Sequence, residues 1–460
     1  MNYNDIVKHL VDNFVFTTIE KEFSFNEEHF DGKRMISGPS HIFWELFDWR
    51  FYERNGQYFH DINMINFLKS YKIMSKLDYE LAMIQKKKKI ILEMSLHPCS
   101  DSLHPHQTMK EKFIDILFKD KELLNKMRKG ELFLLLYQGW EPQNFTEKTR
   151  ETDTIDSYYE IFDLVFKQYN LPSNSIILMG SNIRNIEYKK QFKPNLNKVS
   201  TIIDNFMEVQ SFCAIPNNTM LDMNYSFEEH IKNIKKSDKT LLRLSRTHND
   251  FRNLMLYFIY HNNFEDRSII EHRKFDLDYA GCSVPEVFNV DTKVLNKIYN
   301  DIPMVASKFE IGKDVENYSN QAIPYDVYKN TIFSWCSSSL PEQIDKVYLS
   351  QSTFNPMLFY HPIVWHAQPY HIECLKKYGY KTYDWLFDES ADSVDEYEWK
   401  NDYIKLRNNF KDISNVMNMD RNKLIDKLKE NKETLEHNRN LLIQCKSIER
   451  IITKFYETTI

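Results

Sequence analysis

The sequence predicts an α/β protein made of two consecutive α/β domains and a helical C-terminal segment. Short, continuous apolar runs at residues 132–137 and 175–179 are typical of strands buried on both faces of a sheet. A helical pattern at 155–169 lies between them, and strand, helix, strand with short connections predicts a right-handed parallel β-α-β unit. Residues 401–460 contain neither Gly nor Pro and carry apolar residues at helical spacing, which predicts a pair of amphipathic helices packed on the α/β domains.

Composition narrows the class of protein. The 460 residues are 42% hydrophobic and 14% aromatic, enough for several cores, and the net charge of −6 argues against a protein that mainly binds nucleic-acid phosphates. None of the nine glycines has the spacing of a P-loop or of a dinucleotide-binding fingerprint. The six cysteines form no C-x-x-C pair, no basic and apolar leader opens the chain, and the apolar runs are too short for a membrane span. These features predict a soluble, cytoplasmic protein.

The expected domains follow from where the regular pattern begins and ends. Residues 1–110, which include a strand at 90–94, form an N-terminal elaboration of the α/β domain at 111–236. A second α/β domain is expected at 237–400, ahead of the C-terminal helices. The elements expected in this second domain are strands at 240–244, 347–349 and 361–365, a helix at 250–261, and a helix at 370–378 that Gly379 ends.

Open parallel sheets bind ligands outside the carboxyl ends of their strands, so the loops that follow the strands are the places for a site. Arg246 follows the strand at 240–244, and Arg252 lies in the first turn of the next helix. Free N–H groups and the helix dipole favour anions at a helix N-terminus, and a guanidinium adds paired donors that suit a phosphate. The two arginines could therefore bind one diphosphate. The alternative is an ordinary exposed Arg252 and an Arg246 paired with a carboxylate.

The order of motifs after residue 240 resembles that of a known group of enzymes. The segments are Leu242 to Arg252, Val347 to Met357, Phe359 to Ile363, Gly379 to Tyr383 and Asp388 to Ser390. In this order they are similar to phage, viral and bacterial nucleotide-sugar glycosyltransferases of the fucosyltransferase-like branch of the GT-B fold. The resemblance is usable over residues 240–400 and weak over 130–440.

The resemblance implies two Rossmann-like domains that face a cleft, with a helical C-terminal tail. The domain at 237–400 would bind a nucleoside-diphosphate sugar, the earlier domain would bind a hydroxyl acceptor, and neither a metal nor another cofactor is expected. Glu141 would be the catalytic base, although a simple loop carboxylate ahead of Pro142 is the alternative. The remaining expected site residues are Arg246 and Arg252 for the diphosphate, Gln351, Ser352 and Thr353 for the nucleoside, and Asn182 for the acceptor or cleft.

The chain departs from the group at the expected donor site. Gln351-Ser352 stands where the group has Glu-Lys, Asn355 stands at a further lysine, and Ser337-Ser338 replaces a Glu-Thr pair. In the group the glutamate is expected to bind a ribose and the lysine to neutralise phosphate. Gln351 can still accept a hydrogen bond, but Ser352 cannot replace a cation. The departures leave open a non-catalytic, glycosyltransferase-like binding or scaffold protein.

Two metal-binding hypotheses come from short motifs. Asp276 and Asp278 form a D-x-D triplet, the pattern by which metal-dependent GT-A transferases hold a sugar nucleotide. The His- and Cys-containing segment 97–106 fits no familiar zinc spacing and is interpreted as a loop. The acceptor (a glycan, a protein or modified DNA), the oligomeric state, and the host cytoplasm as the location of a viral protein stay open.

Overall fold

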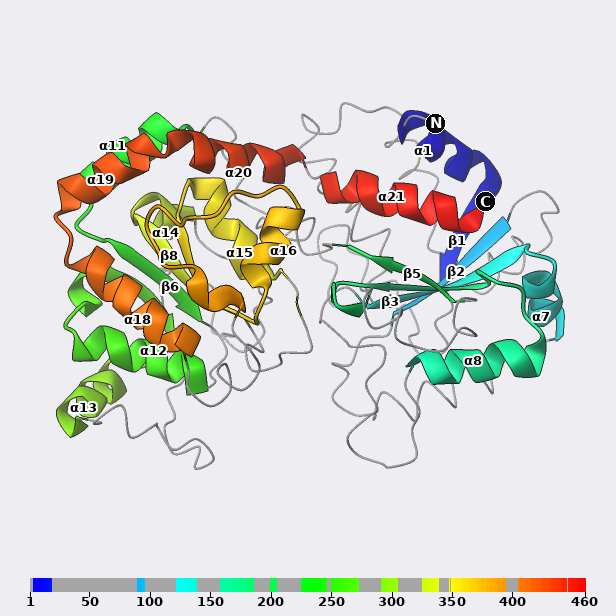
Figure 1. Ribbon diagram of the computed structural model, residues 1–460, viewed down its shortest axis with the longest axis horizontal. Coiled ribbons are helices and arrows are strands. Elements are labelled where there is room, and N and C mark those ends of the chain that lie inside the picture. The colour runs from blue at the N-terminus through cyan, green and yellow to red at the C-terminus, as the bar shows by residue number, and fades with distance from the viewer. Residues whose placement is uncertain are drawn as a thin grey trace, which may run out of the picture. The chain divides into compact units, whose positions relative to one another are not determined.

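The protein is described here from a computed structural model (Figure 1). The residues that the structure describes are 3–18, 89–95, 121–138, 158–185, 199–204, 225–245, 250–272, 291–304, 325–338, 347, 349–393, 404–444 and 446–460. The chain divides into two compact units. Unit 1 comprises Met1–Cys213 and Lys446–Ile460, and unit 2 comprises Ala214–Cys445. Both ends of the chain therefore belong to the same unit.

Unit 1 contains a sheet of five parallel strands in the order β1-β2-β3-β4-β5. Its strands are β1 (Phe14–Thr18), β2 (Lys89–Ser95), β3 (Leu132–Gln138), β4 (Ile176–Gly180) and β5 (Ser200–Ile203). The apolar runs of β3 and β4 form the middle of this sheet, where both faces are covered, and Leu132–Leu136 and all five residues of β4 are buried. The α/β class predicted from these runs is confirmed.

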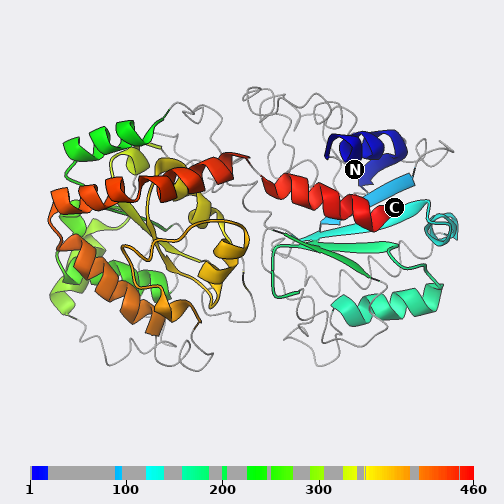
Figure 2. The ribbon, with the colours of Figure 1, turned by 45° about the horizontal axis from the view of Figure 1, so that its top comes forward.

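The helices of unit 1 cover both faces of its sheet (Figures 1 and 2). Within the described residues they are α1 (Tyr3–Asn13), α7 (Lys121–Arg128), α8 (Tyr158–Tyr169) and α21 (Lys446–Thr459). Strands that pair in chain order have right-handed crossovers in one direction, which place the connecting helices on one face. Helix α8 lies on that face, whereas α1 and α21 lie side by side on the other. The two ends of the chain thus cover the face opposite α8.

A buried carboxylate joins α21 to the end of β5. Asp204 is fully buried, and its Oδ1 atom accepts a hydrogen bond from Arg450 Nη2 at 3.1 Å. Its Oδ2 atom lies 2.7 Å from Lys454 Nζ, which also donates to the carbonyl of Ile203 at 2.9 Å. Lys89 of β2 donates to the carbonyl of Thr459 at 3.1 Å, at the negative end of the helix dipole. These contacts fix the last helix of the chain to a sheet formed mostly by its first half.

Replacing Asp204 with alanine should lower the free energy of unfolding of unit 1 by about 2 kcal/mol, the typical loss of hydrogen bonds to a buried charge. The loss is limited because Arg450 and Lys454 are 32% and 43% exposed and regain water. Urea denaturation, with hydrogen exchange of α21 as the local readout, measures it. Exposed Glu449→Ala on the same helix is the control. Equal stability of the two variants would show that Asp204 does not anchor α21.

Unit 2 contains a sheet of four parallel strands in the order β7-β6-β8-β9. Its strands are β6 (Leu241–Ser245), β7 (Ser268–His272), β8 (Phe333–Ser337) and β9 (Ile363–His366). From β6 the chain first adds β7 on one side, and then returns past β6 to add β8 and β9 on the other. This reversal creates a topological switch point between β6 and β8. The described strands of unit 1 follow chain order and have no such reversal.

Helices surround the sheet of unit 2. The α-helices are α11 (Phe227–Lys236), α12 (Asp250–His261), α13 (Thr292–Asp301), α14 (Tyr325–Lys329), α15 (Gln351–Phe354), α16 (His371–Lys377), α18 (Ile404–Met417), α19 (Arg421–Glu430) and α20 (Lys432–Gln444), and the short 3-10 helices are η4 (Glu265–Arg267), η6 (Asn355–Phe359) and η7 (Ser390–Ser393). Trp335 of β8 packs against Phe258 of α12 and Phe410 of α18, whose rings stack at 4.2 Å. The two helices therefore share one face of the sheet.

Arg421 at the start of α19 satisfies the open end of α11. Its guanidinium donates to the carbonyls of Ile234, Ser237 and Lys239 at 2.7, 2.7 and 3.0 Å. The last carbonyls of a helix have no partner within the helix, so an arginine is a favourable cap there.

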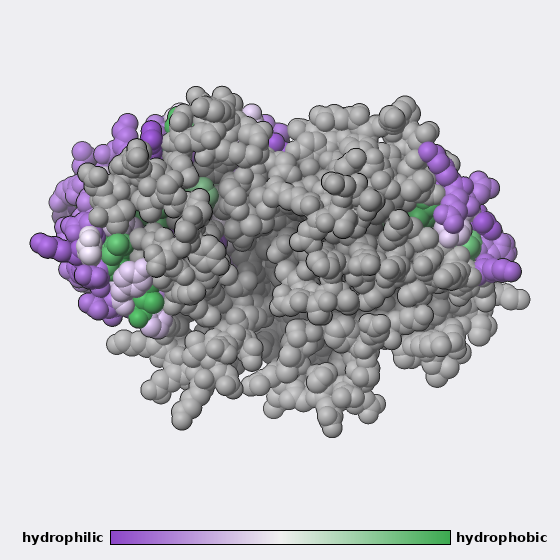
Figure 3. Space-filling view, turned by 90° about the horizontal axis from the view of Figure 1, so that it is seen from below, coloured by the Kyte–Doolittle hydropathy of each residue, from purple (hydrophilic) through white to green (hydrophobic). Residues whose placement is uncertain are grey.

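On the face drawn in Figure 3, the described residues that reach the surface are mainly hydrophilic, with few apolar residues among them.

Most of the elements expected from the sequence are confirmed. Strands occur at or within two residues of each expected position except 347–349, and the helix at 250–261 has the expected bounds. Gly379 follows α16 with φ +90°, a conformation that suits a residue without a Cβ. The strand expected at 347–349 is wrong. Val347 and Leu349 are buried outside the sheet, because β8 occupies the position between β6 and β9.

The compact units differ from the expected domains. Strand β1 pairs with β2, and β2 pairs with β3, so residues 1–110 contribute to the main sheet of unit 1. The C-terminal segment forms four helices where two were expected, with α18, α19 and α20 in unit 2 and α21 in unit 1. None of the helices in the described ranges is long and apolar enough to span a membrane.

Candidate functional site

The switch point of unit 2 lies at the carboxyl ends of β6 and β8. Strand β6 ends at Ser245 and β8 at Ser337, and α12 begins at Asp250 after the loop that follows β6. Parallel strands that diverge at such a point leave room for a ligand outside their carboxyl ends. The N-terminus of a twelve-residue helix thus lies at the edge where a ligand is expected.

Arg252 spans this switch point. It lies in the first turn of α12 and is 8% exposed. Its Nη2 atom donates to the carbonyls of Ser337 and Ser338, at 3.3 and 3.4 Å. Arg252, from the helix that follows β6, therefore binds the backbone at the end of β8. The alternative of an exposed helical residue is wrong, because the guanidinium is turned inward to these carbonyls.

A second arginine lies beneath the first. Arg243 belongs to β6, and its Nη2 atom donates to the carbonyl of Arg252 at 2.6 Å. Its Nη1 atom lies 3.3 Å from Nδ1 of His272, whose Nε2 atom lies 3.0 Å from Oδ1 of Asn253. Because an amide oxygen only accepts, His272 carries its proton on Nε2 and accepts from Arg243 through Nδ1. The chain of bonds fixes both arginines to α12 and to β7.

The environment of Arg243 disfavours its positive charge. The side chain is 1% exposed, and burial, followed by the neighbouring charge of Arg252, lowers the pKa of its guanidinium to about 9. Its partners within the described ranges are a carbonyl oxygen and an imidazole nitrogen, which are both neutral. Burial also raises the pKa of the nearby Cys336 thiol to about 12, so that thiol supplies no negative charge at neutral pH. The Arg252 guanidinium therefore lies close enough to that of Arg243 for the two charges to repel each other.

The end of β9 adds a neutral polar group to this edge. Gln368 donates from Nε2 to Oγ of Ser338 at 2.9 Å, and the amide of Ser338 donates to the carbonyl of His366 at 2.9 Å. The ring of His366 packs on Phe251 of α12 with centroids 4.8 Å apart. Burial, with smaller effects from Lys405 and Arg252, lowers the pKa of His366 to about 3. At neutral pH His366 is therefore uncharged, and its ring packs against α12.

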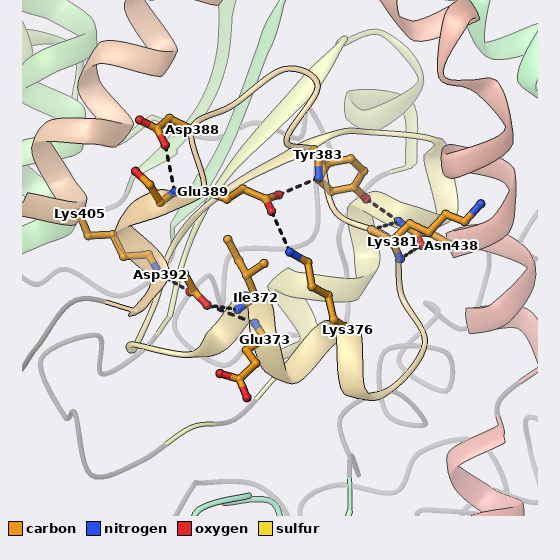
Figure 4. Close-up of polar contacts among 11 residues, drawn as sticks. Ile372, Glu373, Lys376, Lys381, Tyr383, Asp388, Glu389, Asp392, Lys405 and Asn438 are labelled. Atoms are coloured by element: carbon orange, nitrogen blue, oxygen red, sulfur yellow. Dashed lines mark hydrogen bonds and ion pairs between the residues drawn. The ribbon is translucent and has the colours of Figure 1, made fainter.

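Asp392 caps the helix that follows β9 (Figure 4). Its Oδ2 atom accepts hydrogen bonds from the amides of Ile372 and Glu373 at 2.9 and 3.1 Å, in the first turn of α16. Its Oδ1 atom lies 2.8 Å from Nζ of Lys405 on α18. Burial alone would raise the pKa of Asp392, but Lys405 and the backbone donors hold it below its usual range. The N-terminus of α16 is thus already neutralised by a carboxylate of the chain itself.

The Asp388-Glu389-Ser390 segment, which carried part of the resemblance, binds backbone in this structure. Glu389 accepts from the amide of Tyr383 at 2.8 Å, and Asp388 accepts from the amide of Ser390 at 2.9 Å (Figure 4). Asn438 of α20 holds both the amide and the carbonyl of Lys381, at 2.8 and 2.7 Å. These contacts hold the segment after α16 in a defined shape.

The nucleoside and acceptor residues expected from the sequence fall in different units. Gln351 begins α15 in unit 2, Ser352 places its Oγ atom 2.7 Å from that of Ser350, and Thr353 is 1% exposed beside His371. Asn182 lies after β4 in unit 1, fully buried, and its Oδ1 atom accepts from the amide of Arg184 at 3.1 Å. Asn182 thus forms a local turn at the carboxyl end of its strand.

The structure places some of the expected residues together and leaves others undescribed. Arg252 and Gln368, which follows β9, both bind Ser338 at the end of β8. Glu141, Arg246, Asp276 and Asp278 lie outside the described residues, as does the segment 97–106. Among the residues that are described, no group of three His, Cys, Asp or Glu side chains could hold a metal ion.

Sequence reasoning missed Arg243, His272 and Asn253. The available signal was the arginine itself, which interrupts the apolar strand Leu241-Leu242-Arg243-Leu244 at a position that should be buried. Charged residues are almost never fully buried without a partner, so such an interruption marks a candidate site.

No protein-family model matches this chain, and neither the curated proteins nor the solved structures give a match.

Proposed function

We propose that the protein is a glycosyltransferase that moves a sugar from a nucleoside-diphosphate sugar to a hydroxyl acceptor, with the donor bound at the switch point of unit 2. The observation that carries this proposal is the arginine pair at that point: Arg252 lies in the first turn of α12, and Arg243 donates to its carbonyl. A departing diphosphate needs stabilisation of its charge, and guanidiniums with helix N–H groups supply it. The motif order that resembles GT-B enzymes supplies the sugar-transfer class.

The rest of the reaction is assigned by the same resemblance. Unit 1 would bind the acceptor, with Asn182 at the end of β4, and Glu141 would remove the proton of the acceptor hydroxyl. The nucleoside would lie against α15, where Gln351 can accept a hydrogen bond from a ribose hydroxyl.

Such a mechanism uses no metal, so chelation should leave transfer unchanged. Loss of transfer on chelation would favour the GT-A alternative with Asp276 and Asp278.

A non-catalytic nucleotide-binding protein is the second candidate. Ser352 stands where the similar enzymes carry a lysine, and its hydroxyl is bonded to Ser350 at 2.7 Å. Calorimetric titration with UDP and GDP, followed by a search for sugar release from a panel of nucleotide sugars, separates the candidates. Binding with release supports the enzyme, and binding without release supports the second candidate. Absence of binding to the folded protein contradicts both.

Changing Arg246 to alanine is the direct test of the diphosphate site expected from the sequence. Loss of one charge-assisted contact should weaken nucleoside-diphosphate binding by about tenfold or more, because such a contact contributes about 1.5–3 kcal/mol. Binding of the free nucleoside should change little. Calorimetry with UDP or GDP and with the matching nucleoside measures both. An equal loss for nucleoside and diphosphate would show that Arg246 is not a phosphate ligand.

A further inference from the structure

We propose that the carboxyl edge of the sheet of unit 1 binds an oxyanion, the carboxylate or phosphate group of a ligand, through the hydroxyls of Ser181 and Ser447. Ser181 directly follows β4, and Ser447 lies in the first turn of α21. Unit 1 alone carries this site, which is independent of the donor site proposed for unit 2.

The two serines are buried without a hydrogen-bond partner. Ser181 is 3% exposed and Ser447 is 0% exposed. Within the described residues of unit 1, their hydroxyls are the buried side-chain atoms that lack a partner. A hydroxyl that loses water without gaining a hydrogen bond destabilises the fold, so buried polar groups are nearly always paired. Two such groups in one unit therefore indicate a partner from outside the chain.

The serines at the opposite edge of the same sheet are paired. Ser175, 2% exposed just ahead of β4, donates from Oγ to the carbonyl of Pro172. Ser200, the first residue of β5, donates from Oγ to Oδ1 of Asn174 at 2.6 Å. The chain thus satisfies the serines at the amino edge of the sheet and leaves unpaired those at the carboxyl edge. The carboxyl edge is where parallel sheets bind ligands.

The direction of α21 places Ser447 at this carboxyl edge. Arg450, one turn after Ser447, binds Asp204, which directly follows β5. Thr459, at the other end of the helix, accepts from Lys89, the first residue of β2. Helix α21 therefore runs opposite to the strands, and its first turn lies where the strands end.

Both hydroxyls belong to the layer between α21 and the sheet. Ser447 is in line with Ile451 and Phe455, four and eight residues later, and both of these are 0% exposed. Ser181 and Asp204 directly follow the last register pair of β4 and β5, and paired positions of neighbouring strands point to the same face. Asp204 points to α21, so we infer that Ser181 does so as well.

The charges around this place favour an anion. Arg450 and Lys454 bind the single carboxylate of Asp204, at 3.1 and 2.7 Å, so one positive charge remains in excess. Lys446 and Glu449, the exposed charged residues of the first turn of α21, cancel each other. A hydroxyl donates readily to a charged oxygen, and such bonds are stronger than those between neutral groups. An oxyanion satisfies the two hydroxyls and the excess charge together.

The test compares Ser181→Ala, Ser447→Ala and the control Ser175→Ala with wild type, each as the full chain. Apparent affinities for inorganic phosphate and for acetate are measured from thermal unfolding at constant ionic strength, with chloride as the replaced anion. We expect at least one of the two oxyanions to stabilise wild type. Loss of one hydrogen bond to its charge should weaken binding by about tenfold or more in Ser181→Ala and in Ser447→Ala. Ser175→Ala should bind like wild type.

Unfolding without added oxyanion separates a ligand role from a structural one. Alanine removes an unpaired hydroxyl at 181 and 447, so these variants should unfold at the wild-type temperature or above it, whereas Ser175→Ala loses a hydrogen bond and should unfold below it. Hydrogen exchange locates the effect, because a bound oxyanion should slow exchange in the first turn of α21. Three results would overturn the proposal: no stabilisation of wild type by either oxyanion, unchanged affinity in both serine variants, or slowed exchange confined to unit 2.

Discussion

Replacing Asp392 with alanine is expected to lower the free energy of unfolding of unit 2 by about 3–5 kcal/mol, the range for breaking a buried ion pair. Two losses add. Lys405, whose side chain is 4% exposed, is left as a buried charge without its carboxylate. The amides of Ile372 and Glu373 lose their acceptor at the start of α16. Denaturant unfolding followed by hydrogen exchange of α16 and α18 measures the effect.

Two further substitutions separate the cap from the charge. Asp392→Asn retains an acceptor for the amides and removes the charge, so its loss should be smaller than that of alanine. Lys405→Met removes the cation and leaves Asp392 bound to the two amides, so it should also lose less than alanine. Asp426→Ala is the exposed control, because Asp426 and Lys429 are 60% and 44% exposed and such pairs contribute about 0.5 kcal/mol or less. If Asp392→Ala were as stable as this control, the ion pair and cap would not hold α16 to α18.

Apolar runs predicted β3 and β4 in unit 1 and β6 in unit 2, but not β8, which lies inside the sheet of unit 2. Leu132–Leu136 and Ile176–Met179 are continuous and buried, and such runs are typical of central parallel strands. Strand β8 was missed because its sequence, Phe-Ser-Trp-Cys-Ser, mixes polar and apolar residues. Its Ser334 is buried and bonded to Nδ1 of His361 at 2.8 Å, a partner that comes from the segment ahead of β9. Local sequence does not show that a serine is satisfied in this way.

Long-range contacts account for the domain boundaries. The last helix joins unit 1 because Asp204 meets Arg450 and Lys454, partners about half the chain apart in sequence. An amphipathic pattern predicts that a helix packs, but not which sheet it packs on. The same limit applies to the site. Arg252 could be proposed from its place after a strand, whereas Arg243 required the observation that a charge is buried inside that strand.

Acidification is expected to unfold unit 2 through its buried histidines. Burial lowers the pKa of His361 to about 4 and of His366 to about 3, and holds that of His230 well below 6.5. Below pH 6.5 the unfolded chain binds protons that the folded unit does not, so stability is full above pH 6.5 and falls as pH falls toward the folded pKa values. Each histidine contributes about 1.4 kcal/mol per pH unit to this slope.

Two carboxyls of the same unit oppose this slope. Burial raises the pKa of Asp412 to about 6 and raises that of Glu389, so each stabilises the folded unit as pH falls, by at most about 1.4 kcal/mol per pH unit. Because three histidines oppose two carboxyls, the net effect between pH 6 and 4 is a loss of stability as pH falls. Hydrogen exchange at pH 7, 6 and 5, corrected for intrinsic rates, should show protection lost across the sheet of unit 2.

His230 offers the sharpest test of this mechanism. Its Nδ1 atom lies 3.0 Å from the hydroxyl of Tyr225, its Nε2 atom has no hydrogen-bond partner among the described residues, and its ring lies 5.4 Å from that of His361. Asparagine places an amide near the position of Nδ1 and does not titrate. His230→Asn should therefore be less stable than wild type at pH 7, yet lose stability less steeply below pH 6.5, by about 1.4 kcal/mol per pH unit. His261→Asn, at an exposed position on α12, is the matched control for the substitution itself. If His230→Asn kept the wild-type slope, protonation of the buried His230 would not drive acid unfolding.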